Sequence, residues 1–192
     1  MPPFDGDRRG TVKTILAVDD SRTNLNVLGT RLGRLGYLMV LSDSGREALD
    51  LVAGGGIDLI LLDMVMPSLG GVEVLTELRG ARETADLPVI MVTERSEPQD
   101  AVDALAAGAD DWIAKPFAFE LLGARIARTL ARSRRLSELK RSNAALDARI
   151  AARAIELGEI KAELASTKAD RVRLIASIQA LHDEVARLSA HG

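Results

Sequence analysis

A seven-residue repeat of aliphatic residues runs without interruption along the last part of this 192-residue chain. With position a set at Leu136, the a and d positions stay in phase to Leu188, and twelve of these sixteen positions are aliphatic. Proline is absent after Pro116 and aromatic residues are absent after Phe119. A heptad repeat of this length predicts one long helix that pairs with another helix through its a and d positions. We therefore expect an α-helical coiled coil over 132–190.

The expected seam of this coiled coil is mostly leucine and isoleucine. Its members are Leu136, Leu139, Asn143, Leu146, Ile150, Leu157, Ile160, Leu164, Leu174, Ile178, Leu181, Val185 and Leu188. Asn143 is a polar residue at an a position, where such residues fix the register of paired helices. Three further polar residues, Arg153, Thr167 and Arg171, soften the middle of the seam.

Charged residues beside the seam favour two parallel copies of the same helix. Glu156 can pair with Lys161, and Glu163 with Lys168, between the g and e positions of a parallel dimer. The alternatives are a solvated single helix or a linker to a further segment. Isolated helices are marginal in water and an exposed aliphatic seam is a liability, so we favour a homodimer.

Upstream of the repeat, short apolar runs alternate with amphipathic stretches, which is the pattern of a parallel α/β sheet. The predicted strands are 14–18, 37–41, 59–62, 89–92 and 112–114. The predicted helices are 23–35, 44–53, 71–80, 98–107 and one that begins near Phe119. Ser44 and Glu47 predict a capping box at the start of the second helix. We expect a five-stranded doubly wound domain over 12–131, preceded by a flexible segment over 1–11.

Composition excludes several classes of site. The chain has no cysteine, which rules out disulfides and thiolate metal sites, and its two histidines cannot build a histidine-rich metal cage. Its apolar runs are far shorter than the roughly 20 residues that span a bilayer, and its first residues do not read as a signal peptide. We therefore expect a cytoplasmic protein without membrane contact.

Charge is distributed unevenly between the two parts of the chain. Residues 1–131 carry 13 Lys and Arg against 20 Asp and Glu, whereas residues 132–192 carry 12 against 8. An acidic first part suits a cation site better than a nucleic-acid surface, and the modest positive excess of the second part lies along a predicted helix. We expect no nucleic-acid partner.

Polar residues follow the predicted strands at their carboxyl ends. They are Asp19 and Asp20 after the first strand, Asp63 after the third, Thr93 after the fourth and Lys115 after the fifth. Carboxyl ends of parallel strands meet at one sheet edge, where open α/β sheets bind their ligands. Three carboxylates at one edge repel one another unless a hard divalent cation lies among them, and Mg²⁺ prefers such oxygen ligands. Asp is also common in turns and helix caps, which is the simpler alternative.

These residues stand in segments that resemble the receiver domain of bacterial two-component response regulators. The segments are VDDS at 18–21, LDMVMPSLGG at 62–71, VT at 92–93 and ADDWIAKPF at 109–117. The resemblance covers about 12–131 and implies a flavodoxin-like fold. It also implies that Asp63 is the phosphoacceptor and that Asp19, Asp20 and the backbone carbonyl of Val65 help to hold Mg²⁺ beside it.

The same resemblance implies roles for residues after the fourth and fifth strands. Thr93 and Lys115 would sense the phosphoryl group, the bond between Lys115 and Pro116 would be cis, and Trp112 would stand at the position of the switch aromatic. A lone Trp in a strand is more often a core residue, so a purely structural role stays open for Trp112. Glu94 departs from the small residue usual after the switch Thr and could repel an incoming phosphodonor.

The sequence therefore predicts a response regulator without an output-enzyme motif, phosphorylated by a histidine kinase or phosphotransfer protein. Two alternatives remain: a regulatory fragment of a larger signalling enzyme, such as a cyclase, phosphatase or histidine kinase, and a structural dimerisation protein with a silent receiver fold. His182 stands in LHDEV, which resembles the phosphoacceptor box of one group of histidine kinases. A solvated residue on the flank of the helix is the simpler interpretation of His182.

Overall fold

The computed structural model describes residues 12–94 and 98–189, without the side chains of residues 98, 100, 184 and 188. The predicted flexible segment 1–11 and the side chain of the predicted seam residue Leu188 thus lie outside the described residues. Contacts within the chain divide it into two units, Met1–Ser137 and Glu138–Gly192. The division falls later than residue 131, where the sequence suggested it.

The first unit is built on one parallel sheet of five strands. The strands are β1 (Thr14–Val18), β2 (Leu38–Ser42), β3 (Leu59–Asp63), β4 (Val89–Thr93) and β5 (Asp111–Ala114). Their order across the sheet is β2-β1-β3-β4-β5, which confirms the predicted doubly wound fold. The order reverses between β1 and β3, so the carboxyl ends of these two strands flank the switch point where such sheets bind ligands.

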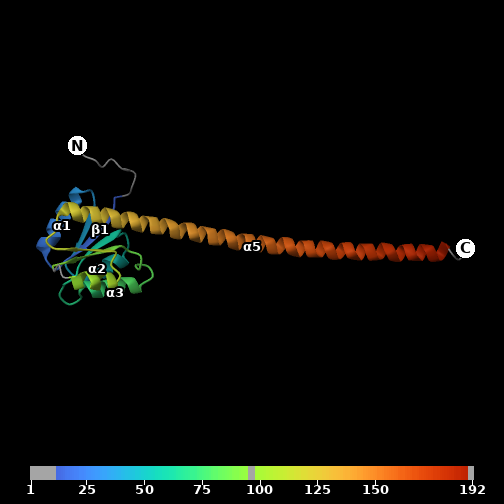
Figure 1. The fold of residues 1–192 in the computed structure, drawn as a ribbon, viewed down its shortest axis with the longest axis horizontal. Coiled ribbons are helices and arrows are strands. Elements are labelled where there is room, and N and C mark those ends of the chain that lie inside the picture. The colour runs from blue at the N-terminus through green and yellow to red at the C-terminus, as the bar shows by residue number, and fades with distance from the viewer. Residues whose placement is uncertain (1–11, 95–97, 190–192) are drawn as a thin grey trace, which may run out of the picture. The chain divides into compact units, whose positions relative to one another are not determined.

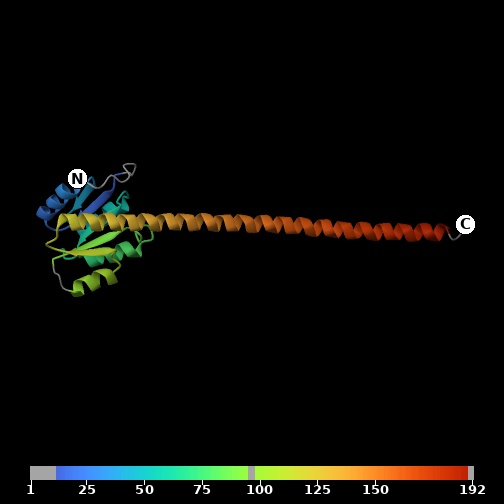
Figure 2. The ribbon, with the colours of Figure 1, turned by 45° about the horizontal axis from the view of Figure 1, so that its top comes forward.

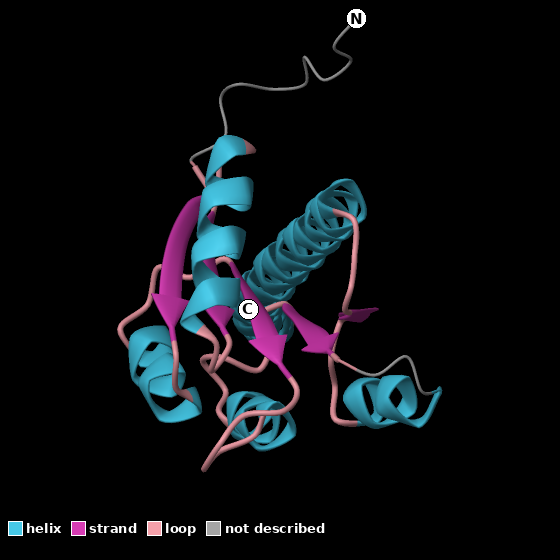
Figure 3. Cartoon of the chain, turned by 90° about the vertical axis from the view of Figure 1, so that its left-hand side faces the viewer, coloured by secondary structure: helices cyan, strands magenta, loops and turns pink. Residues whose placement is uncertain are grey.

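Helices cover both faces of this sheet. They are α1 (Arg22–Arg34), α2 (Gly45–Ala53), α3 (Gly71–Gly80), α4 (Pro98–Ala106) and α5 (Phe119–Ser189). Leu25 and Leu32 of α1 pack with Leu122 and Ile126 of α5 against one face. Helices α2, α3 and α4 pack against the other face, as the view along the sheet in Figure 3 shows. Strands β3 and β4 are buried along their whole length, which explains their continuously apolar sequences.

Tertiary pairing shifts one predicted strand. The second strand was predicted to begin at Tyr37, but β2 begins at Leu38, which pairs with Thr14 of β1. The Tyr37 N–H instead donates to the Leu32 carbonyl at the end of α1, at 3.3 Å. The ladder with β1 then continues through Ser42.

The predicted capping box of α2 forms only in part. The Ser44 hydroxyl caps α2 by accepting from the Glu47 N–H at 3.5 Å. The Glu47 carboxylate, however, accepts from the Ser42 hydroxyl at 2.7 Å. Ser42 in turn accepts from the Ser44 N–H at 3.3 Å. In a complete capping box the Glu47 carboxylate would accept directly from the Ser44 N–H, whereas here the Ser42 hydroxyl lies between these two groups.

Helix α5 is one uninterrupted helix of 71 residues, and its first turns up to Ser137 belong to the sheet unit. Figures 1 and 2 show its continuous course through the second unit, which confirms the predicted long helix. The aliphatic residues of the expected seam from Leu139 to Val185 are exposed on this single chain. Arg153 pairs within the helix with Glu156. The pairing of two helices is outside what one chain tests and stays a prediction. Over the residues described, no helix is both long and apolar enough to cross a membrane.

Candidate functional site

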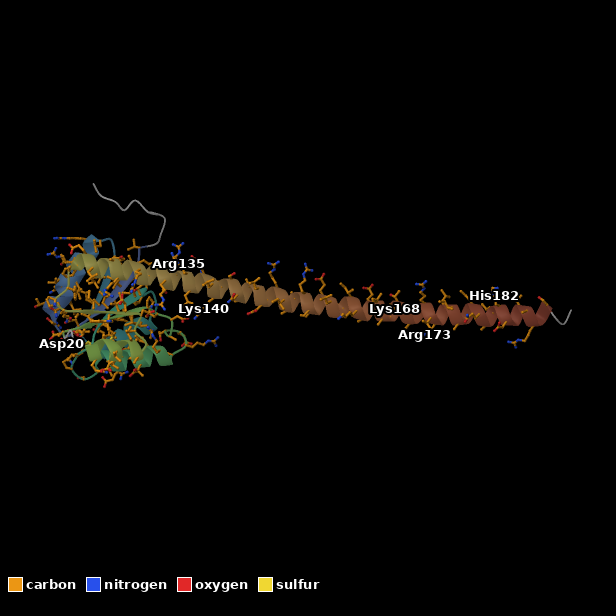
Figure 4. All side chains as sticks on the ribbon, viewed as in Figure 1. Asp20, Arg135, Lys140, Lys168, Arg173 and His182 are labelled. Carbon is orange, nitrogen blue, oxygen red and sulfur yellow. The ribbon has the colours of Figure 1, made fainter. Side chains whose placement is uncertain are left out.

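Three carboxylates meet at the carboxyl edge of the sheet, beside the switch point. Asp19 directly follows β1 and Asp63 is the last residue of β3, and their exposed fractions are only 2% and 3%. Asp20 is exposed, and Figure 4 labels it. One oxygen from each of the three carboxylates lies within 4.8 Å of the others. The structure therefore brings together the three acidic residues that the sequence placed after different strands.

Lys115 joins the two buried carboxylates. Its ammonium donates to Asp19 Oδ2 at 2.9 Å and to Asp63 Oδ2 at 2.6 Å. The Lys115 N–H donates to the Thr93 carbonyl at 2.7 Å, which holds the backbone of Lys115 beside the end of β4. The bond between Lys115 and Pro116 is cis. The short distances are those of charge-assisted hydrogen bonds, so Lys115 partly offsets the repulsion between Asp19 and Asp63.

Asp19 is held by further donors that the sequence analysis did not identify. The Ser21 N–H donates to Asp19 Oδ1 at 2.9 Å. The Asn24 amide donates to both oxygens of Asp19, at 3.1 Å and 3.2 Å. Asn24 lies in the first turn of α1, whose cap Ser21 immediately follows the Asp19–Asp20 pair. An amide one turn into the helix after an acidic pair is the sequence signal that could have identified it.

The pKa values of the three central groups follow from these contacts. Burial opposes ionisation of Asp19, but its bonds from Lys115, Ser21 and Asn24 outweigh burial and lower its pKa. Burial raises the pKa of Asp63, and the Asp19 charge adds to this rise against the lowering effect of Lys115. Burial also disfavours the Lys115 ammonium, yet the two carboxylates raise the pKa of Lys115. Lys115 therefore stays a cation, and Asp63 is the carboxylate that is most costly to ionise.

A tight backbone junction fixes Asp63 between β3 and α3. Asp63 pairs with Val92 in the ladder to β4, and its Oδ1 accepts from the Val65 N–H at 3.3 Å. The Gly71 N–H donates to the Met64 carbonyl at 3.1 Å, which closes the loop back onto the strand end. A Cβ on Gly71 would lie 2.1 Å from the Asp63 carbonyl oxygen. The glycine that ends the LDMVMPSLGG segment is thus required by backbone contact.

The remaining predicted site residues lie at the same edge or beside it. Thr93 is buried as the last residue of β4, one residue beyond Val92, which pairs with Asp63. Glu94 follows Thr93, and its Oε1 lies 4.0 Å from the Lys115 ammonium nitrogen. Trp112 of β5 is half-buried and packs against the core on the α2, α3 and α4 side. This packing fits either a core residue or an aromatic that changes position.

The donor set fits a hard divalent cation. Carboxylate oxygens at this spacing are the ligands that Mg²⁺ prefers, and exposed Asp20 leaves room for the waters that Mg²⁺ retains. A cluster of three carboxylates, two of them buried, with one ammonium keeps a negative charge, which further favours a cation. The same edge carries a lysine and a buried threonine, the residue types that can bind phosphoryl oxygens. The arrangement is thus an acidic cluster, with a lysine and a buried threonine beside it, at the edge of a doubly wound sheet.

Comparison with known proteins defines the class. Residues 15–127 match the family model described as the response regulator receiver domain, so the chain belongs to this family. The match spans the sheet, the three carboxylates and the first turns of α5.

Several known proteins resemble the chain over this segment. The response regulator MprA of Mycolicibacterium vanbaalenii is 44% identical over 119 residues, 62% of this chain and 51% of that protein. MprA of Mycobacterium tuberculosis is 42% identical over 120 residues. The chain thus spans about half the length of these curated relatives. The chemotaxis response regulator CheY4 of Vibrio cholerae aligns with a TM-score of 0.59 and 31% identity over 62% of this chain and 99% of CheY4.

Proposed function

We propose that this receiver accepts a phosphoryl group on Asp63 with the help of Mg²⁺ and passes the resulting change into a parallel homodimeric coiled coil. The observation that carries the proposal is the Lys115 ammonium bridging two nearly buried carboxylates, Asp19 and Asp63. Among the groups of the site, Asp63 combines a raised pKa with a rigid position at the end of a central strand. A histidine kinase or phosphotransfer protein is the donor that membership of the family supports.

The residues divide the chemistry among them. An Asp63 carboxylate oxygen attacks phosphorus, forms the new O–P bond and breaks the bond between phosphorus and the donor. Asp19, Asp20 and the Val65 carbonyl would hold Mg²⁺, which supplies neutralisation of the charge on the phosphoryl oxygens. Lys115 can follow these oxygens because its ammonium already touches Asp63. The Thr93 hydroxyl would donate a hydrogen bond to the phosphoryl group and so draw the end of β4 inwards.

The coupling to the helix rests on β5. Asp111 of β5 is buried and pairs with Arg125 and Arg128 of α5, at 2.6 Å and 3.1 Å. The next residue, Trp112, belongs to the same strand, and Lys115 follows its end. A change in the loop after β4 that repacks Trp112 would thus move β5, and the ion pairs of Asp111 would pass this movement to α5. Two states of this contact would bias the angle or register of the paired helices.

Phosphorylation of Asp63 is tested by incubating the full chain with Mg²⁺ and a small phosphodonor, followed by intact mass spectrometry. We expect one added phosphoryl group in the wild type and none in Asp63→Asn. Peptide mapping should place the group on Asp63. Labelling that survives Asp63→Asn, or that maps to His182, would contradict the assignment.

The transmission step needs a separate measurement. Spin labels on the exposed flank of the helix report distances between two copies with and without beryllofluoride, a phosphoryl mimic. We expect a dimer in both states and a shift in the distance distribution on adding the mimic. Distances that ignore the mimic would show that the helix is not coupled to the site.

A further inference from the structure

Glu94 adds a fourth carboxylate to the site at its outer side. Its Oε1 lies 4.0 Å from the Lys115 ammonium nitrogen, which touches Asp63 at 2.6 Å. Lys115 therefore stands between an inner carboxylate that is nearly buried and an outer one whose side chain is 70% exposed. Any donor that brings phosphorus to Asp63 must approach from solvent, the side on which Glu94 is exposed.

We expect the Glu94 carboxylate to affect an incoming donor through its charge more than through its size. Among the described residues, the carboxylates near Asp63 are those of Asp19, Asp20 and Glu94, and the Lys115 ammonium pairs with Asp19, Asp63 and Glu94. Glu94 also forms a longer ion pair with Lys115, the ammonium that would meet the incoming phosphoryl oxygens. An incoming group that gains negative charge is opposed by Glu94, and one that carries a positive charge is favoured.

We propose that Glu94 is a specificity-determining residue that favours phosphodonors with an N–P bond over acyl phosphates. This inference rests on the proposed phosphorylation of Asp63 and deepens it by naming the donor class. Phosphoryl groups on a histidine nitrogen belong to the favoured class, and small acyl phosphates to the disfavoured one.

The two donor classes leave with different charges. In an N–P donor the leaving group is protonated, on the leaving nitrogen itself in phosphoramidate and on the other ring nitrogen in a phosphohistidine. The N–P bond breaks, the leaving nitrogen keeps the electron pair, and a neutral amine or imidazole departs as the Asp63 O–P bond forms. In an acyl phosphate the leaving oxygen keeps the electron pair and departs as a carboxylate anion. A carboxylate at the outer side of the site stabilises the positive charge of the protonated amine or imidazole ring and repels the developing carboxylate.

The test compares two small donors, acetyl phosphate and phosphoramidate, at saturating Mg²⁺ on the full chain. Because an exposed pair has only a weak interaction, we expect Glu94→Gln to raise the rate with acetyl phosphate by about threefold to fivefold. The rate with phosphoramidate should stay the same or fall. The change in the ratio of the two rates should shrink at high ionic strength, since exposed charges are screened.

Two further variants separate charge from other causes. Glu94→Ala removes the bulk as well as the charge, whereas Glu94→Gln keeps the shape. Glu77→Gln removes a matched exposed glutamate on α3, which pairs with Arg46 of α2 at 3.7 Å. This substitution should leave both rates unchanged. Asp63→Asn identifies the phosphoryl signal as that of Asp63.

The outcomes are distinct. A rate with acetyl phosphate that rises in Glu94→Ala but not in Glu94→Gln would assign the effect to bulk and overturn the proposal. Equal changes with both donors in Glu94→Gln would also overturn it, because donor class would then play no part. If neither the wild type nor Glu94→Gln takes up phosphoryl on Asp63 from either donor, the proposed function itself fails, and the role of Glu94 fails with it.

Discussion

Asp19 and Asp63 are both nearly buried and share one lysine, yet their pKa values shift in opposite directions. The difference lies in the other donors. Asp19 accepts from the Ser21 N–H and the Asn24 amide, whereas Asp63, among the residues described, accepts besides Lys115 only the longer bond from the Val65 N–H. Asp63 is thus the carboxylate with the less satisfied charge, which suits its proposed role as the phosphoacceptor.

This imbalance predicts the stability of Asp63→Asn. Because folding raises the Asp63 pKa, its ionised form destabilises the fold at neutral pH. Asparagine resembles the protonated carboxyl, so Asp63→Asn should raise the free energy of unfolding at pH 7 without divalent cations. The advantage should fade as the pH falls through the folded-state pKa and be gone below the ordinary value of 3.8. Urea unfolding across this pH range measures it.

Mg²⁺ provides the control for this prediction. A cation that binds only the folded state stabilises it by mass action, and the wild type places a charged carboxylate beside the proposed Mg²⁺ site where Asp63→Asn places a neutral amide. Adding Mg²⁺ should therefore stabilise the wild type more than the variant. A variant less stable than the wild type at neutral pH without Mg²⁺ would show that loss of the Lys115 bond outweighs relief of the buried charge.

Single residues also show where reasoning from sequence ended. Asp63 and Thr93 could be predicted because each stands where a strand ends, and the topology brings strand ends together. Asn24 was not identified, because its place in the first turn of α1 is a weaker signal than a strand end and its contact depends on the direction of its side chain. Asp111 gave no sign that it pairs with Arg125, because a strand and a helix are joined there by tertiary packing.

At the scale of elements, the junction of β3 and α3 depends on the absence of a side chain at Gly71. A Cβ there would meet the backbone of Asp63 and Met64, which cannot move aside as a flexible side chain can. Gly71→Ala should therefore cost about 2 kcal/mol or more in the free energy of unfolding. It should also slow phosphorylation, because the Asp63 backbone must shift.

A second helical glycine is the matched control. A Cβ on Gly33 of α1 would meet nothing within 4 Å. Gly33→Ala should be neutral or stabilising by up to about 1 kcal/mol, because alanine favours the helix. Chemical denaturation of both variants checks the pair. Equal effects of the two substitutions would show that helix propensity, and not the contact with Asp63, governs the junction.

The ion pairs between β5 and α5 should also contribute to the free energy of unfolding. Asp111 is buried and accepts from Arg125 and Arg128, and Arg128 is 73% exposed. Asp111→Ala leaves the partly buried Arg125 without this partner and should cost about 2–4 kcal/mol in thermal or urea unfolding. Arg128→Ala should cost at most about 1 kcal/mol, because exposed ion pairs contribute little. A loss of less than about 1 kcal/mol in the free energy of unfolding of Asp111→Ala would show that these ion pairs are too weak to couple β5 to α5.

Some element boundaries are set by local sequence and others by tertiary pairing. Helix α3 has the predicted bounds of 71–80 because Gly70 and Gly71 open it locally. Strand β2 is displaced from its prediction because its register is set by β1, which local sequence does not report. The Glu47 carboxylate accepts from the buried Ser42 hydroxyl instead of closing the capping box. Ser42 is placed there by the pairing of β2 with β1, which local sequence does not report either.

At the scale of the whole molecule, the long helix presents aliphatic residues that one chain cannot bury. Lys140, Lys168, Arg173 and His182 mark positions along its surface in Figure 4. The exposed aliphatics recur mainly at the a and d positions, as a paired helix requires. The length and phase of this pattern were visible in the sequence, whereas the number and direction of the paired helices depend on a second chain.

Two neighbouring aliphatic residues provide the sharpest test of this pairing. Leu157 at an a position is 56% exposed on the single chain, and Ile155 at an f position is 66% exposed. If the seam pairs, Leu157→Lys places two ammonium groups in the interface, while Ile155→Lys leaves them on the outer face. We expect Leu157→Lys to weaken the dimer by about 2 kcal/mol or more, hence over tenfold in Kd. Sedimentation equilibrium should show no such change for Ile155→Lys. A monomeric wild type at micromolar concentration, or equal weakening by both substitutions, would show that the helices do not pair through the a and d positions.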